Sequence, residues 1–164
     1  MDKSIQKAIN KQIGLELYSA YVYLAMSAHF AEQNFDGFAG WIRGQASEEQ
    51  EHAMRLFDYL LERGAHVELG AVNAPPKEFG TPLEIYEEAL GHEREVTKSI
   101  HAIYELAREK KDYATEIALQ WFITEQVEEE DSIGVVVDQL KMAGDNQAAV
   151  LMLDRQLANR GGAE

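Results

Sequence analysis

The chain has 164 residues and no cysteine, so it is long enough to bury a core but can hold neither a disulfide nor a thiolate zinc or iron–sulfur site. Its formal charge of -14, from 29 acidic against 15 basic side chains, argues against a nucleic-acid partner and suits a protein that handles cations. No segment approaches the roughly 20 apolar residues of a membrane span and no signal peptide is recognisable, so we expect a cytoplasmic protein without a membrane partner.

The first two predicted helices are joined by a short break at residues 34–37. The first helix covers residues 4–32, and its inward stripe steps alternately by four and three residues. That stripe consists of Ile9, Ile13, Glu16, Ala20, Tyr23, Ser27 and Phe30. The second helix ends near Gly64, a residue type that favours the left-handed conformation after a helix. Its stripe consists of Phe38, Trp41, Gln45, Glu49, His52, Leu56 and Tyr59.

The third predicted helix begins at Thr81, with Pro82 at its first position and Glu84 completing a capping box. Its stripe consists of Tyr86, Ala89, Glu93, Val96, Ile100, Ile103 and Ala107. The fourth helix starts near Asp112 and stops at Gly144. Its stripe consists of Thr115, Leu119, Phe122, Gln126, Glu129, Ile133, Val136 and Leu140. A short amphipathic segment over residues 148–157 predicts a fifth helix.

Alternating steps of three and four are typical of the seam of a helix bundle. Short connections make the first and second helices, and likewise the third and fourth, antiparallel hairpins. The segment over residues 65–80 contains Pro75 and Pro76, has no helical period and is long enough to run the length of the bundle, which would make the second and third helices parallel. We therefore predict an all-α four-helix bundle with a long crossover between helices two and three and a short fifth C-terminal helix.

Six polar residues interrupt the four apolar stripes at one depth. Each lies within about three residues, or about 5 Å, of the midpoint of its helix; they are Glu16, Glu49, His52, Glu93, Gln126 and Glu129. An ion pair or a core hydrogen bond would explain one such residue, but four inward carboxylates without a basic neighbour repel one another. A pair of metal cations is the partner that fits, and iron accepts carboxylate oxygens together with an imidazole.

The chain resembles the non-haem ferritins of bacteria and archaea over essentially its whole length. The local matches are Leu15–Ser19, Glu48–His52, His92–Glu93, Gln120–Phe122 and Glu125–Glu130. The resemblance implies one ferritin-like di-iron domain over residues 1–164, with ferroxidase activity towards Fe(II), dioxygen or peroxide as the oxidant, and storage of Fe(III) mineral. It also implies a homo-oligomeric shell of 24 subunits.

Two local features distinguish the chain from other di-iron bundles and from bacterioferritins. Many di-iron bundles carry Glu-x-x-His on two helices, whereas this chain has it once, at Glu49 and His52, and has Gln126 and Glu129 on the fourth helix as ferritins proper do. Gln50 stands where bacterioferritins have their haem-binding methionine, so no haem is expected.

Carried over by position, the resemblance implies a first iron bound by Glu16, Glu49 and His52. The second iron would be bound by Glu93 and Glu129, with Glu49 as the bridge. Gln126 would hold oxygen or water nearby. Tyr23 matches the family's tyrosine beside the centre, although packing alone would also explain an aromatic residue there.

A third iron site is implied at Glu48, Glu125 and Glu128, with Glu129 shared. The alternative is that these carboxylates form a solvated acidic face. Three further acidic residues around the turn between the third and fourth helices are candidates for a pore lining: Glu109, Asp112 and Glu116.

Three other classes of protein compete with an iron store. A di-iron oxygenase or peroxidase would need a substrate pocket beside the metals, and a rubrerythrin would also need cysteines. DNA-protecting mini-ferritins build their site between subunits, with ligands placed differently along the helices. A structural or signalling bundle has no use for Glu49 and His52 at its middle.

Overall fold

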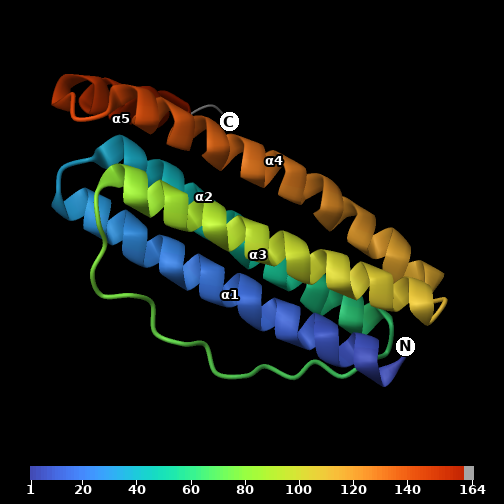
Figure 1. The fold of residues 1–164 in the computed structure, drawn as a ribbon. Helices are drawn as coiled ribbons and strands as arrows, with labels where there is room; N and C mark the ends of the chain where they lie inside the picture. Colours follow the sequence, from blue (N-terminus) through green and yellow to red (C-terminus); the bar gives the residue numbers. More distant parts are fainter. Residues whose placement is uncertain (161–164) are drawn as a thin grey trace.

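A computed structural model describes residues 1–160 as five helices without a strand (Figure 1). The helices are α1 (Lys3–Glu32), α2 (Asp36–Glu62), α3 (Pro82–Glu109), α4 (Tyr113–Ala143) and α5 (Gln147–Arg160). The first four form the bundle, and α5 packs beside the beginning of α2 (Figure 1). The predicted all-α four-helix bundle with a fifth C-terminal helix is confirmed. Residues 161–164 of the predicted domain lie outside the described part.

The crossover between α2 and α3 follows α1 along the bundle (Figure 1). At one end, Asn10 donates a hydrogen bond to the carbonyl of His66 at 3.0 Å and accepts one from the Glu68 amide at 2.8 Å. At the other end, the Phe79 ring lies 5.5 Å from the ring of His29. Because α1 advances about 28 Å between Asn10 and His29, the crossover traverses the bundle and α2 and α3 run parallel, as predicted.

The helix ends obey local sequence rules in most places. Thr81 and Glu84 form the predicted capping box at the start of α3, and Gly64 and Gly144 follow α2 and α4 with φ of 63° and 53°. The exception is α2, whose preceding residue provides no side-chain cap. There, Asp154 of α5 accepts a hydrogen bond from the Phe38 amide at 2.8 Å.

Two apolar clusters fill the two halves of the bundle. One contains the second half of α1, the first half of α2 and the residues of α4 around Ile133. The other contains the first half of α1, the second half of α2 and the start of α4 around Leu119. Every predicted stripe position is buried except Trp41 and Tyr59, which are half-buried. Within residues 1–160, no helix is both long and apolar enough to cross a membrane.

Candidate metal centre

A layer of polar side chains separates the two apolar clusters. It consists of the six residues that interrupt the stripes, each at most 5% exposed: Glu16, Glu49, His52, Glu93, Gln126 and Glu129. All four bundle helices contribute to this polar layer. The six residues lie at one level because each is near the middle of its own helix. The depth argument made from the sequence therefore predicted the burial of all six.

Three of these residues bring their ligand atoms together. One atom each from Glu16, Glu49 and His52 lie within 4.8 Å of one another, and His52 Nδ1 is 3.9 Å from Glu49 Oε1. Glu16 Oε2, Glu49 Oε2 and His52 Nδ1 are buried and have no hydrogen-bond partner among the described residues. Buried polar atoms are almost always paired, so three unpaired atoms in one place call for an external partner, and a cation fits them.

The surroundings of His52 keep its imidazole neutral. Its ring lies edge-on to Trp121, with the ring centroids 5.4 Å apart. The Arg55 guanidinium lies over the Trp121 ring, 3.9 Å from its centroid. Burial, followed by the charge of Arg55, lowers the pKa of His52 to about 4. At neutral pH the imidazole therefore keeps a free lone pair for a metal.

The carboxyl groups of the polar layer are electrostatically strained without a cation. Burial raises the pKa of Glu16 to about 7. Burial, together with the charges of Glu93 and Glu48, raises the pKa of Glu129 to about 8. The pKa of Glu49 is raised well above its ordinary value by burial and by the charges of Glu93 and Glu16. Near neutral pH the layer retains protons that a bound cation would displace.

Glu93 differs from the three residues with unpaired atoms, because both of its oxygens are occupied. Its Oε1 accepts a short hydrogen bond from the Tyr23 hydroxyl, and its Oε2 accepts one from Gln126 Nε2 at 3.0 Å. Burial and the charge of Glu93 raise the pKa of Tyr23 well above its usual range, so its hydroxyl stays protonated and donates. Tyr23 therefore contacts the polar layer by a hydrogen bond as well as by packing.

The residues predicted for a third site are only partly brought together. Glu125 and Glu129 form a second group with His52, with one atom each within 4.8 Å. Glu48 is exposed, and the charge of Glu125 is among the causes that raise its pKa, after partial burial. Glu128 is exposed, and within residues 1–160 it belongs to neither group.

Asp112 belongs to a different polar cluster, at the end of the bundle. This end cluster consists of Tyr59, Arg63, Asp112 and Thr115. Arg63 donates to the two oxygens of Asp112 at 2.9 and 3.1 Å and to the Tyr59 hydroxyl at 2.5 Å. The Thr115 amide donates to Asp112 as well, at 3.2 Å. Asp112 is thus engaged as a helix cap and ion-pair partner, and the predicted pore role of this residue stays a prediction.

Three polar residues beside the layer were not identified as site residues from the sequence. Gln12 Nε2 donates to Glu16 Oε1 at 2.9 Å, and the Ser99 hydroxyl donates to Gln12 Oε1. Gln45 donates a short hydrogen bond to Glu48. The available signal was the spacing, since Gln12 precedes Glu16 by four residues and therefore shares its helical face.

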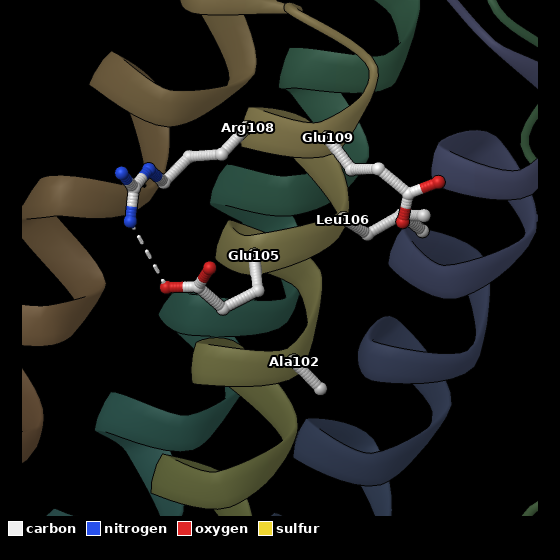
Figure 2. Close-up of a pocket in the computed structure, with 5 residues that line it drawn as sticks. All are labelled: Ala102, Glu105, Leu106, Arg108 and Glu109. Atoms are coloured by element: carbon white, nitrogen blue, oxygen red, sulfur yellow. Dashed lines mark hydrogen bonds and ion pairs between the residues drawn. The ribbon is translucent and has the colours of Figure 1, made fainter.

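A hollow on the surface of α3 lies apart from the polar layer. Figure 2 shows Glu105 paired with Arg108 on one flank of the helix, at 3.4 Å, and Leu106 and Glu109 turned to the other flank. Its polar groups diverge instead of converging on a common point, so it lacks the arrangement expected of a binding site.

Comparisons with known proteins agree with this geometry. The family model of the ferritin-like domain matches residues 6–143. A bacterial non-heme ferritin of Bacteroides fragilis (strain 638R) is 40% identical over 160 residues, which cover 98% of this chain and 99% of that protein. The open pore ferritin of Archaeoglobus fulgidus superimposes with a TM-score of 0.95 at 44% identity, covering 96% of both chains. An engineered closed form of that ferritin gives a TM-score of 0.94.

Proposed function

Because the chain belongs to the ferritin family, we propose that it oxidises Fe(II) at the polar layer and stores the Fe(III) product as a mineral inside a shell of its own copies. The observation that carries this proposal is the convergence of Glu16, Glu49 and His52. Their buried ligand atoms lack internal partners, and carboxylate oxygens with one imidazole are a donor set that suits iron.

Two neighbouring iron positions are proposed. Glu16, Glu49 and His52 bind the first Fe(II), while Glu93 and Glu129 bind the second and Glu49 bridges the two. Gln126 stays a polar neighbour for oxygen or water. Both Glu93 oxygens accept hydrogen bonds, from Tyr23 and Gln126, and each oxygen keeps a second lone pair with which it could bind iron.

The proposed reaction is a two-electron oxidation. Two Fe(II) ions held roughly 3.5–4 Å apart each lose one electron to the same dioxygen, which takes up two protons and becomes hydrogen peroxide. Peroxide can accept electrons from a further iron pair in the same way, forming water. Hard carboxylate ligands stabilise Fe(III) over Fe(II) and so favour the oxidation. A single histidine ligand leaves the product labile enough to move on to the mineral.

A shell of 24 subunits is proposed to enclose the mineral. Large apolar side chains are exposed on α1, on the crossover and at the start of α4, at 39% to 69% of their surface: Tyr21, Leu24, Leu69, Val72, Tyr113 and Ile117. Burial of such residues between copies would stabilise an assembly. The formal charge of -14 per chain would draw Fe(II) towards the shell.

An accessory iron position beside the pair is proposed at Glu48, Glu125 and Glu129, with Glu128 within reach only if its exposed side chain turns inward. The grouping of Glu125 and Glu129 with His52 supports this arrangement. Glu48 and Glu125 are nearer to solvent than the ligands of the paired sites, so we expect weaker binding there.

The deciding experiment measures iron per chain together with particle mass. Hundreds of irons in a particle of several hundred kilodaltons would support storage. Two irons in a monomer or dimer would indicate a di-iron oxidase without a store. A protein that binds no iron would be a structural bundle, and the proposal would fail.

A further inference from the structure

Gln12 connects the polar layer to α3 and takes no part in the proposed iron chemistry. It is 1% exposed and lies one helical turn before Glu16 on α1. Its side-chain Nε2 donates to Glu16 Oε1 at 2.9 Å, and its Oε1 accepts a hydrogen bond from the Ser99 hydroxyl of α3. Both ends of this buried amide are therefore satisfied.

The chemistry of the partners fixes the orientation of the amide. Gln12 Nε2 donates to Glu16 Oε1, and a carboxylate that binds a metal is ionised and only accepts hydrogen bonds, so the NH2 group of Gln12 faces Glu16 in the metal-bound state. A hydroxyl can donate, so Ser99 completes the arrangement by donating to the amide oxygen. Consequently, Glu16 Oε1 is held in place by an internal hydrogen bond, whereas Glu16 Oε2 is buried without a partner among the described residues.

We propose that Gln12, anchored by Ser99, is a positioning residue that occupies Glu16 Oε1 and leaves Oε2 alone to bind a metal ion. Glu16 then binds through one oxygen, and a coordination position that a bidentate carboxylate would fill stays open. This inference rests on the proposed function, because it assigns a role to Gln12 only if Glu16 binds metal.

Glu16 and Glu93 differ in how many of their carboxylate oxygens accept internal hydrogen bonds, and this difference supports the role of Gln12. Glu93 has both oxygens occupied by internal donors, whereas Glu16 has one occupied and one free. Partners that hydrogen-bond metal ligands orient them, and removing such partners typically weakens metal binding about 10–100-fold. A purely structural cross-link between α1 and α3 would instead affect only stability.

The test uses Co(II), a redox-stable divalent ion whose visible spectrum reports its coordination. Apo protein is titrated with Co(II), and the first binding event is followed by calorimetry and by visible absorption. In Gln12→Met, which keeps the length of the side chain but removes the donor, we expect about 10–100-fold weaker binding and an altered band shape. Ser99→Ala, which removes only the anchor, should shift both readouts in the same direction by less.

Ser27→Ala is the matched control. Ser27 is a buried polar residue of the same helix that donates to the Ala39 carbonyl at 2.9 Å, far from the polar layer. It should bind Co(II) like the parent protein. If Gln12→Met and Ser99→Ala fold with lowered melting temperatures but keep the parent affinity and spectrum, Gln12 is a structural cross-link and the inference is wrong. The Ser99→Ala result decides alone if Gln12→Met does not fold.

The parent protein separates this inference from the proposed function. If the parent binds no Co(II), or if His52→Ala binds it as tightly as the parent, the metal centre itself is misassigned. If the parent binds Co(II) through His52 and the Gln12 and Ser99 variants match it, only the role of Gln12 fails.

Discussion

The polar layer and the end cluster are both rich in charged groups, but they differ in whether those groups have partners. In the end cluster, Arg63 donates to both oxygens of Asp112 and to Tyr59. In the polar layer, ligand atoms of Glu16, Glu49 and His52 have no partner among the described residues. Charged groups inside the fold thus mark a candidate binding site when their internal partners are missing, and a structural element when the partners are present.

Loss of a ligand from the polar layer should have the largest effect. In His52→Ala, we expect initial Fe(II) oxidation to fall by about 100-fold or more, because removing a ligand should exceed the effect of removing an outer partner. The fold and the particle mass should stay unchanged, since one buried imidazole contributes little to the apolar clusters. Stopped-flow absorbance measures the rate. An unchanged rate would remove His52 from the proposed site.

The second-largest expected effect is the pH dependence of the free energy of unfolding of the metal-free protein. In the folded state the pKa of Glu16 is about 7 and that of Glu129 is about 8, above their values in the unfolded chain. Between the unfolded and the folded pKa of each group, the folded state therefore binds more protons than the unfolded state. Stability should therefore fall as pH rises, by about 2 kcal/mol between pH 6.5 and 8.5. The opposite effect of His52, whose pKa is lowered from 6.5 to about 4, is mostly complete at pH 6.5 and offsets only a small part of this fall within the window.

Chemical denaturation of the metal-free protein at several pH values measures this slope. A saturating redox-stable cation that binds only the folded state should raise the melting temperature most at pH 8.5. Glu93→Gln should stabilise the apo form and lose much of that gain. Apo stability that rises with pH across the window would contradict the proposed strain in the polar layer.

Breaking the end cluster should lower stability without affecting the chemistry. In Asp112→Ala, we expect a loss of about 1–2 kcal/mol from the lost cap and hydrogen bonds, measured by denaturant unfolding. Initial Fe(II) oxidation should match the parent. A large decrease in oxidation rate with unchanged stability would contradict this assignment and support the pore role predicted from the sequence.

The accessory carboxylates should show the smallest effects. Glu125→Ala should leave the fast oxidation of the first two irons per chain intact and change the oxygen consumed per iron at higher loading. Glu128→Ala should change it less, because Glu128 lies outside both groups in residues 1–160. Anomalous scattering from iron-soaked crystals provides a direct test. A third peak beside Glu128 and away from Glu125 would contradict the expected order.

The fold was predictable because periodicity, caps and loop length agree. The alternating steps of three and four residues along the apolar stripes predicted that all six polar-layer residues are buried. The length of the crossover predicted that α2 and α3 run parallel. The role of Asp112 was not predictable, because its partner Arg63 lies 49 residues away in sequence. The contact between Gln12 and Ser99 spans 87 residues, so helical spacing could suggest only the half of that network within α1.

The contact between Asp154 and α2 has a consequence for the order in which the chain folds. The Phe38 amide is capped by a residue 116 positions later, and a Cβ atom on Gly37 would lie 1.7 Å from the Asp154 carbonyl oxygen. During synthesis, the hairpin of α1 and α2 emerges long before α5, so the first turn of α2 stays frayed until the C-terminal helix docks. Ribosome-bound chains truncated before α5 should therefore exchange the amide hydrogens of that turn faster than complete chains.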